Sequence, residues 1–506
     1  MRRRTFRLLL ALSLFAGLVP GISGAALASD SEPKGAVHSD NMTLVKQLQY
    51  EARNGTRANG GTDLEFTQID VTDLESAAAR GVTGTRTFSF AGSYDNGLQI
   101  VDVTDPDEAA IVGVYDCGVR QGDVQLFTRE VDGVERTYAA YTQDTGYGFA
   151  RQSACYTEAE ALGFRRPDYG TFIADVTDPY NPVTVSYVRV PKGSHNQTVH
   201  PSGNYLYNSN SDLITSAASA GIEIYDIRDL AAPKHVTTLS LPVRPGLGTE
   251  SHDLTFNKEG TRAYSAALSQ TVIINTEDPE KPSIVTSFMD PAINVEHQSD
   301  PVTLTDKTTG LTREFLIIED EVAGATPTGQ CPNGGVHVYD ITGPLELAPV
   351  KVGYWNIDDV RTFSTSLGCT AHVFEIHEEQ ALMTIAYYQG GVRVVDLSGL
   401  IGVALGNAGV GMKELGFYYF ESGVADQPSN TWAVKAPFVT RDGSFEIYGN
   451  DQNRGMDIYR FSWDEASSTE TGQWLTPKQA LKLAQKRNAL SGGAIGKPYC
   501  LLGDRV

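Results

Sequence analysis

Four of the nine histidines stand at the start of short runs of alternating apolar and polar residues. His195 lies in Gly-Ser-His-Asn-Gln-Thr, His252 in Glu-Ser-His-Asp-Leu-Thr, His297 in Val-Glu-His-Gln-Ser-Asp and His372 in Thr-Ala-His-Val-Phe-Glu. Neutral imidazole is the commonest metal ligand in proteins and suits zinc, copper, iron and nickel. These four side chains would form a metal site if the fold brings them to one point, which depends on the elements that carry them.

A ten-residue pattern recurs along the chain and identifies those elements. Most copies have a Gly or Gln at the start, alternating β-forming residues, an Asp or Asn at the strand exit and a turn such as Thr-Asp-Pro. The seven copies are GLQIVDVTDP (97–106), GTFIADVTDP (170–179), GIEIYDIRDL (221–230), QTVIINTEDP (270–279), GVHVYDITGP (335–344), GVRVVDLSGL (391–400) and GMDIYRFSWD (455–464). Such repetition indicates a repeat architecture.

Each copy is preceded and followed by further β-like runs, for example 262–267 before the fourth copy and 283–288 after it. With the run that begins near each histidine, this makes four short strands per unit. Seven such units predict an all-β fold, a seven-bladed β-propeller of four-stranded blades. The seventh unit lacks its own fourth strand, and residues 41–48 have the alternation of one. We expect this N-terminal strand to complete the last blade and cover its edge.

The repeats resemble those of the LVIVD-repeat proteins of bacteria, named for the strand that reads Leu98-Gln-Ile-Val-Asp102 and Val392-Arg-Val-Val-Asp396 here. The resemblance covers residues 41–463 and implies a secreted β-propeller. Members of this group are mostly described as propellers of unassigned function, so the resemblance implies no activity. The seventh unit departs most from the pattern, because Arg460 stands where the Asp is usual.

The segments at the two ends are expected to lie outside the propeller domain of residues 41–463. Residues 1–28 combine a basic start, an apolar run and Ala26-Leu27-Ala28, which is the pattern of a cleaved signal peptide. Arg3-Arg4-Thr5-Phe6 also resembles a twin-arginine signal, and the two export routes remain alternatives. We expect a secreted, extracellular protein without a membrane span. Residues 464–506 form a C-terminal tail in which Thr476-Pro477 predicts a capped short helix over 476–488.

Charge and cysteine content restrict the partners and the compartment. The formal net charge is −22, and removal of the four arginines of residues 1–28 leaves −22 − 4 = −26. Such a field repels phosphate backbones, so we expect no nucleic-acid partner. Five cysteines in an exported chain favour two disulfides with one residue, Cys500, left over. In a propeller, Cys117 with Cys155 and Cys331 with Cys369 would each join a link between blades to a neighbouring long loop.

The four histidines occupy equivalent positions in units three to six. The first strand of every propeller blade lines the central channel, so these side chains can converge near the axis. The other units carry Thr62, Gly122 and Trp432 at this position, which favours a metal site over a packing device common to all blades. We predict a transition metal ion, copper or iron, with zinc or manganese as alternatives. Hydrogen bonding of the imidazoles to the backbone of the next blade remains the competing interpretation.

Acidic residues near the histidines could orient the imidazoles from behind. The candidates are Glu250, Asp253, Glu296, Asp300 and Glu375. The long insertions 143–169, 209–220 and 321–334 are expected to cover the same mouth of the channel. A small-molecule or polymer ligand would bind there.

Two functions from different classes fit these features. One is a metal-dependent oxidoreductase, an oxidase or oxygenase, or a metal-dependent hydrolase that activates water. By analogy alone it is similar to the carotenoid-cleaving oxygenases and the selenium-binding/methanethiol oxidase propellers, whose sequence motifs this chain lacks. The other is a non-catalytic secreted binding or scaffold propeller that recognises a protein or polymer. A zinc ion across the channel could also be purely structural.

Overall fold

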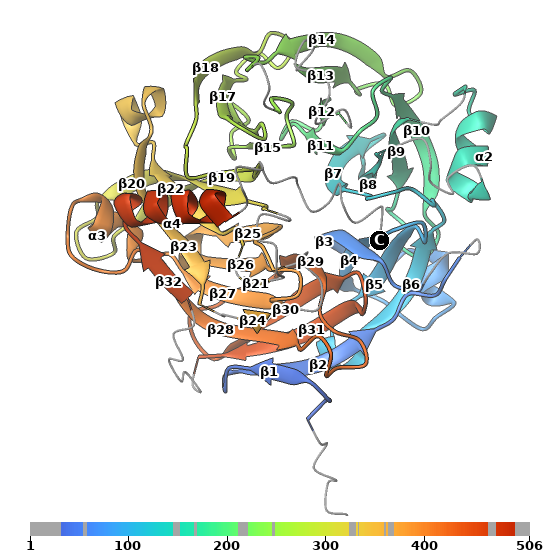
Figure 1. Ribbon diagram of the computed structural model, residues 1–506. Helices are drawn as coiled ribbons and strands as arrows, with labels where there is room; N and C mark the ends of the chain where they lie inside the picture. Colours follow the sequence, from blue (N-terminus) through green and yellow to red (C-terminus); the bar gives the residue numbers. More distant parts are fainter. Residues whose placement is uncertain are drawn as a thin grey trace, which may run out of the picture. The chain divides into compact units, whose positions relative to one another are not determined.

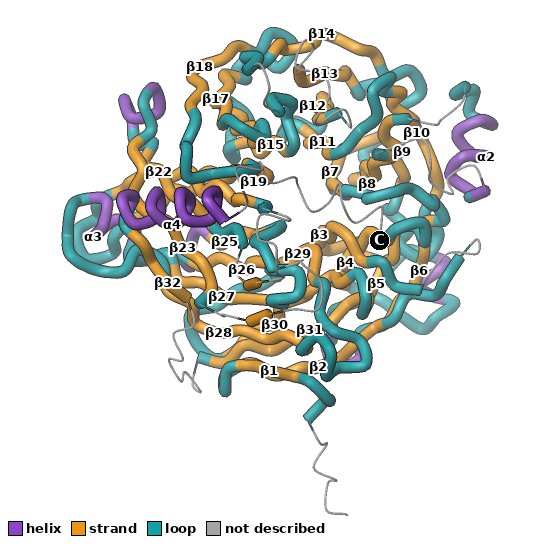
Figure 2. Tube along the Cα trace, in the orientation of Figure 1, coloured by secondary structure: helices purple, strands orange, loops and turns teal. Residues whose placement is uncertain are grey.

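In the computed structural model, residues from 34 onwards form a ring of antiparallel sheets (Figure 1). Residues 32–53, 58–144, 152–165, 169–210, 221–244, 248–322, 330–331, 333–358, 361–362, 369–463 and 472–490 are described by the structure. The predicted signal peptide, 1–28, lies outside the described residues. The tube view shows that strands dominate the ring (Figure 2).

The first four blades each contain four strands that follow one another in sequence. Blade one consists of β3 (Gly61–Asp70), β4 (Thr85–Ser93), β5 (Leu98–Asp102) and β6 (Ala110–Tyr115). Blade two consists of β7 (Val124–Val131), β8 (Val134–Gln143), β9 (Gly170–Asp175) and β10 (Val183–Arg189). Blade three consists of β11 (Asn196–Val199), β12 (Tyr205–Ser209), β13 (Gly221–Asp226) and β14 (Lys234–Ser240). Blade four consists of β15 (Asp253–Phe256), β16 (Arg262–Ala266), β17 (Thr271–Asn275) and β18 (Ser283–Phe288).

The last three blades take up strands from both ends of the described chain. Blade five consists of β19 (Glu296–Thr305), β20 (Thr312–Asp320), β22 (Val336–Asp340), β23 (Val350–Ile357) and β32 (Gly472–Leu475). Blade six consists of β25 (Phe374–His377), β26 (Leu382–Ala386), β27 (Val392–Asp396), β28 (Lys413–Phe420) and β1 (Ala36–His38). Blade seven consists of β29 (Thr431–Lys435), β30 (Ser444–Asp451), β31 (Gly455–Ser462) and β2 (Met42–Leu48).

The ring closes as the sequence predicts. Strand β2 pairs antiparallel with β31, from Met42 opposite Phe461 to Leu48 opposite Met456. This pairing covers the edge of blade seven with backbone hydrogen bonds and ties the N-terminal part of the chain to the C-terminal part. The structure adds two edge strands that the repeats do not show, because β1 pairs with β28 and β32 pairs with β23.

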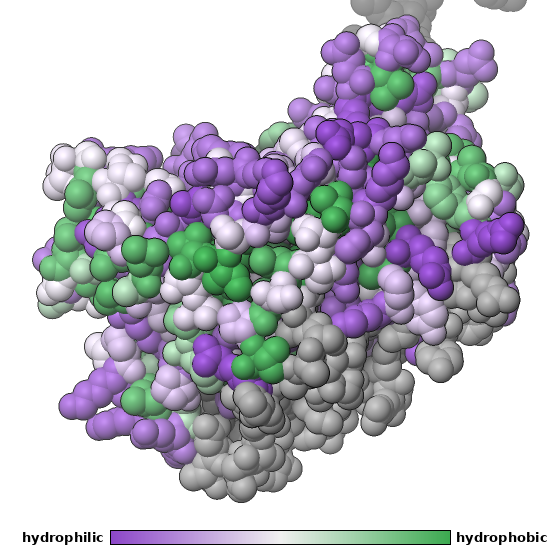
Figure 3. Space-filling model, turned by 90° about the horizontal axis from the view of Figure 1, so that it is seen from above, coloured by the Kyte–Doolittle hydropathy of each residue, from purple (hydrophilic) through white to green (hydrophobic). Residues whose placement is uncertain are grey.

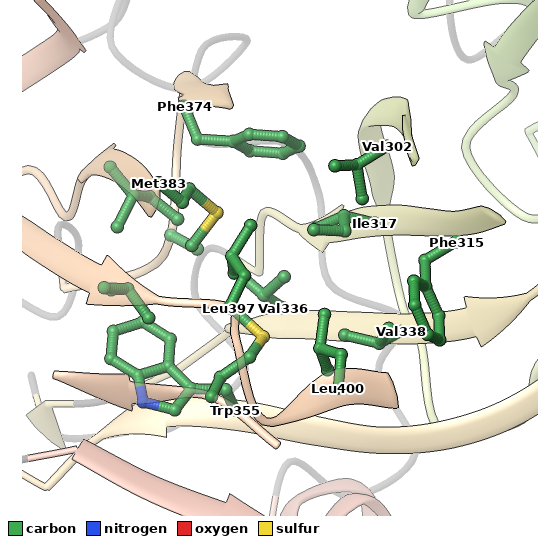
Figure 4. Packing of buried hydrophobic residues seen from close by; sticks show 14 of the residues in the cluster. Val302, Phe315, Ile317, Val336, Val338, Trp355, Phe374, Met383, Leu397 and Leu400 are labelled. Atoms are coloured by element: carbon green, nitrogen blue, oxygen red, sulfur yellow. The ribbon is translucent and has the colours of Figure 1, made fainter. Parts of the chain in front are cut away.

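The hydrophobic core is divided among the junctions between blades. Seven large buried clusters each combine side chains from two neighbouring blades, including one that joins blade seven to blade one. In Figure 4, Phe315, Ile317 and Val338 of blade five face Phe374 and Met383 of blade six. Because each strand presents apolar residues to both faces of its sheet, every blade packs against two neighbours, and the inner strands are fixed around the axis.

The helices lie outside the ring of inner strands. They are α1 (Glu75–Ala78), α2 (Ala154–Ala161), α3 (Leu400–Ala404) and α4 (Pro477–Leu490), with short 3-10 turns at Pro106–Glu108, Gly343–Leu347 and Glu378–Gln380. The predicted C-terminal helix therefore exists as α4, which follows β32 beside blade five (Figure 1). Within the described part of the chain, none of the helices is long and apolar enough to cross a bilayer. Hydrophilic and hydrophobic residues are interspersed on the face drawn in Figure 3.

The glycine at the start of several repeats has a conformational role. Gly391 precedes β27 with φ +74°, and a Cβ atom there would lie 2.1 Å from the carbonyl oxygen of Tyr418. We expect Gly391→Ala to lower the free energy of unfolding by about 2 kcal/mol, because an L side chain strains a left-handed backbone and meets the next strand. Gly409→Ala, where a Cβ meets nothing within 4 Å, is the matched control and should be nearly neutral. Denaturant titration measures both, and equal losses would contradict the assignment.

Candidate metal centre

The four histidines lie at the beginning of the innermost strands of blades three to six. His195, His252 and His372 stand just before β11, β15 and β25, while His297 is the second residue of β19. The backbone N–H groups of His195, His252 and His372 each donate to the carbonyl oxygen of the last residue in the second strand of the same blade. These acceptors are Ser209, Ala266 and Ala386, respectively. The same local hydrogen bond therefore sets the height of three histidines along the channel. Figure 1 shows these inner strands around the centre of the ring.

The structure brings the four imidazoles together in the order of the blades. Neighbouring ring centroids are 4.3 Å apart for His195 and His252, 4.1 Å for His252 and His297, and 4.3 Å for His297 and His372. The Nε2 atoms of His195 and His252 are 3.0 Å apart. Two nitrogen atoms bound to one ion at about 2.1 Å lie about 3.0 to 3.4 Å from each other. This first pair therefore has the spacing of two ligands of a single metal ion.

Hydrogen-bond acceptors contact Nδ1 of two of the imidazoles, which leaves their Nε2 atoms available to bind a metal ion. Asp144 Oδ2 lies 3.3 Å from Nδ1 of His195, and the carbonyl of Trp432 accepts a hydrogen bond from Nδ1 of His372. An acceptor at Nδ1 selects the tautomer that carries its hydrogen there, so Nε2 retains its lone pair. The Nε2 atom of His372 is buried and has no hydrogen-bond partner within the described residues. A metal ion would satisfy it.

A buried glutamate completes the group. One carboxylate oxygen of Glu321 is 3.8 Å from Nε2 of His297 and the other is 3.7 Å from Nε2 of His372. His252, His297 and Glu321 each offer a ligand atom, and these atoms lie within 4.8 Å of one another. The hydroxyl of Tyr388 donates to Glu321 Oε1 at 2.7 Å, and its ring lies 4.6 Å from that of His372. Tyr388 is buried with φ +45°, a strained conformation for a bulky residue of the kind found at functional sites.

Burial favours the neutral form of His252, His297 and His372. It is the largest cause that holds the pKa of His252 and of His297 well below the usual value, and the neighbouring histidines lower both further. Burial likewise lowers the pKa of His372 to about 3. Near Nδ1 of His297, at 2.9 Å, lies Oε2 of Glu319, although the two atoms are not aligned for a hydrogen bond. Burial, with Glu321 beside it, raises the pKa of Glu319 well above the usual value.

The acidic residues that the sequence proposes as partners of the imidazoles make other contacts. Glu250 accepts from the backbone N–H of Gly221, and Glu296 accepts from the hydroxyl of Thr271. The remaining three, Asp253, Asp300 and Glu375, line a cavity of about 680 Å³ that the four histidines also line. The carboxylates that lie beside the imidazoles, Asp144, Glu319 and Glu321, come instead from second strands and the residues that follow them.

Sequence reasoning missed these three carboxylates, although the sequence carries a signal for two of them, Glu319 and Glu321. Glu319, Asp320 and Glu321 form an acidic run at the end of the buried strand β20, where blades four and six continue with Ala266-Ala267 and Ala386-Tyr387. Three consecutive acids at the buried end of a second strand are costly unless a cation or hydrogen-bond donors balance them. Comparison of second strands between units could have identified them.

The predicted lid is described only in part. Helix α2 belongs to the insertion 143–169, and the disulfide between Cys117 and Cys155 fixes its first turn, as predicted. Residues 145–151, 166–168, 211–220, 323–329 and 332 lie outside the described residues. Cys369 is disulfide-bonded. The side chain of Cys331 and the whole of Cys500 lie outside the described residues, so the pairing of Cys331 with Cys369 stays a prediction.

Comparison with known proteins gives no assignment. No protein-family model matches the chain and no curated protein matches it. The resemblance to the LVIVD-repeat group therefore stays a prediction.

Solved structures match the chain only at low identity. They include a Bacteroides fragilis protein provisionally named a 6-phosphogluconolactonase (10% identity, TM-score 0.41, 82% of this chain and 98% of that chain). Others are the hydrazine synthase of Kuenenia stuttgartiensis (10%, 0.45, 81% and 98%) and a periplasmic gluconolactonase of Pseudomonas aeruginosa (11%, 0.35, 72% and 84%). At these scores the likenesses carry no argument about chemistry, and the fold rests on the strand pairing described above.

Proposed function

We propose that this protein is an exported metalloenzyme with a mononuclear transition-metal centre that carries out oxidation chemistry. The ion is copper or iron, held by His195, His252, His297 and His372 together with Glu321. One observation carries the proposal: the ligand atoms of His252, His297 and Glu321 lie within 4.8 Å of one another, and the buried rings of His195 and His372 pack against those of His252 and His297. Neutral imidazole suits both metals.

Charge balance supports a bound cation. Glu321 is fully buried, with one carboxylate oxygen near Nε2 of His297 and the other near Nε2 of His372, and it accepts a hydrogen bond from Tyr388. A carboxylate in a dry site is costly unless a positive charge or several hydrogen bonds stabilise it. A divalent ion among the imidazoles would supply that charge, and the lone pairs on Nε2 would bind it without first losing a proton.

The residues around the centre have separate tasks. Asp144 and the carbonyl of Trp432 fix the orientation of His195 and His372 through Nδ1. Tyr388 holds a proton on its hydroxyl, 2.7 Å from Glu321, beside the position where chemistry would occur. A copper or iron ion, when bound, supplies one-electron redox chemistry. Beyond the four imidazoles and Glu321, one position of a six-coordinate ion would remain for another ligand.

The test is the metal content of the purified protein. Elemental analysis should give about one copper or iron atom per chain, and electron paramagnetic resonance should show nitrogen ligation of that ion. Full occupancy by zinc would instead indicate a structural or hydrolytic site. A folded protein that stays empty after incubation with copper(II), iron(II), zinc(II) and manganese(II) in turn would contradict the proposal and leave the non-catalytic binding propeller.

A further inference from the structure

Acidic side chains outnumber lysines in the lining of the cavity beneath the histidines. It is lined by inner strands of all seven blades and extends from the buried histidines to Lys258 and Glu259 in the turn between β15 and β16. Both of these turn residues are exposed. The cavity therefore reaches solvent where the inner strands end, which is the mouth opposite to the one that the insertions were expected to cover.

Six carboxyl groups line this channel, of which that of Asp63 is buried and the other five are partly buried. They are Asp63 and Glu65 of blade one, Asp123 of blade two, Asp253 of blade four, Asp300 of blade five and Glu375 of blade six. Among the described residues that line the cavity, only Lys258 and Lys435 are lysine or arginine. The buried one, Lys435, contacts Glu65 at 2.7 Å and Asp63 at 3.2 Å.

The other four carboxyl groups receive hydrogen bonds from neutral donors. The backbone N–H groups of Gln197, Leu254 and Ala436 donate to Asp123, Asp253 and Glu375, respectively. Asp300 accepts from the hydroxyl of Thr255 and from the amide of Gln298. Burial raises the pKa of Asp300 and of Glu375 to about 7 each, and it holds the pKa of Asp123 well above its usual value. A cation bound in the channel would stabilise the ionised form of these carboxyl groups.

We propose that this channel binds an organic cation, a primary amine or diamine, and presents it to the metal centre as substrate. The substrate role rests on the proposed function. Beyond the acidic lining, a second observation points to a ligand, since the unpartnered Nε2 of fully buried His372 belongs to the same cavity wall. An anionic substrate would be repelled by the lining before it reached the histidines.

The lining favours an organic cation over a bare metal ion. Leu254, Phe256 and Ile376 line the same cavity, and they provide apolar contacts for an alkyl chain. An aromatic ring also attracts an ammonium group through its face. A bare calcium or magnesium ion would prefer a compact shell of oxygen ligands and would gain nothing from these side chains.

The test compares three probes of equal carbon number by calorimetry: butane-1,4-diamine, butane-1,4-diol and succinate. Each is titrated into the protein as purified and into the protein after metal removal by a chelator. The diamine should bind at least about tenfold more tightly than the diol, and succinate should not bind. Equal binding of diamine and diol, tighter binding of succinate, or calcium chloride binding more tightly than the diamine would overturn the proposal. This comparison does not depend on the folding of any variant.

A double variant locates the cation. At pH 8, above the pKa of about 7 of both groups, Asp300→Asn with Glu375→Gln keeps the volume of both side chains and removes two mainly ionised carboxyl groups, and it should weaken diamine binding by about 10- to 100-fold. The matched control, Asp278→Asn with Glu280→Gln in the turn between β17 and β18, should leave the affinity unchanged. Unaltered affinity in a folded channel variant would overturn the proposal.

The two proposals fail separately. A protein that binds the diamine and no metal keeps the cation site but overturns the substrate role. A protein that holds copper or iron and ignores the diamine overturns the inference alone.

Discussion

Replacing His252 and His297 together by alanine should abolish stoichiometric metal binding, with the metal-to-protein ratio falling from about one to below about 0.1. Both residues belong to the group of ligand atoms that lie within 4.8 Å of one another. Changes to residues that only support metal ligands already cost about 10- to 100-fold in affinity, so the loss of two ligands should cost more than about a hundredfold. Elemental analysis after dialysis measures the ratio, and the melting temperature shows whether the variant is folded.

Two further variants make this experiment specific. His235→Ala removes an imidazole whose Nε2 bonds to Thr238 on β14, away from the channel, and should leave the metal content unchanged. Glu321→Gln keeps an oxygen that can accept from Tyr388 but removes the charge, and should lower metal affinity by about 10- to 100-fold. Retention of a full metal complement in a folded His252→Ala/His297→Ala protein would place the ion elsewhere and refute the site.

The replacement Glu375→Gln should stabilise the protein increasingly as the pH rises. Burial raises the pKa of Glu375 to about 7 from the ordinary 4.5, while the backbone N–H of Ala436 and the charge of Lys435 act in the opposite direction. The folded protein therefore holds this proton more tightly than the unfolded chain. The resulting stability is fully present below pH 4.5 and is lost as the pH rises to about 7. Glutamine does not titrate, so the variant escapes this loss.

The expected size of the effect follows from the same pKa. The free energy of unfolding of the variant minus that of the unaltered protein should rise between pH 4 and pH 8 by less than about 3 kcal/mol, because the Glu375 side chain is 33% exposed and solvent screens part of the effect. Lys435, Glu65 and Asp63 also face Glu375 and are the same in both proteins, so the difference isolates one group. Parallel denaturant titrations across this range provide the measurement. The exposed Glu259→Gln is the control variant, and a constant difference for Glu375→Gln would contradict the raised pKa of Glu375.

The architecture could be predicted from the sequence because its cause is local and repeated. Alternating β-forming residues, a strand-exit Asp and a turn recur in each unit, and each unit has one face for each neighbour. The missing last strand and the matching alternation at 41–48 predicted the pairing of β2 with β31, which the structure confirms. Strands β1 and β32 were not predicted. Both are short and lie at sheet edges, where three or four residues carry little periodic signal.

Of the candidate centre, only the histidines could be predicted, because the repeat sets their positions. Equivalent positions in equivalent strands place His195, His252, His297 and His372 at one level, and the structure brings their rings together. Glu321 does not follow from this reasoning, because it lies beyond the end of a second strand and reaches the site from the side. The acids expected behind the imidazoles, such as Asp300 and Glu375, line the channel below them instead.

The sequence by itself thus determined the number of blades, the closure of the ring and the level at which the histidines stand. These features depend on periodicity within the chain, which sets strand register and the face to which each side chain points. The tertiary structure alone decided which carboxylates meet the imidazoles, and it gathered acids from five blades around one cavity. It also decided that this cavity reaches solvent where the inner strands end. Such contacts join residues far apart in sequence, and their distances depend on how packed sheets are placed around an axis.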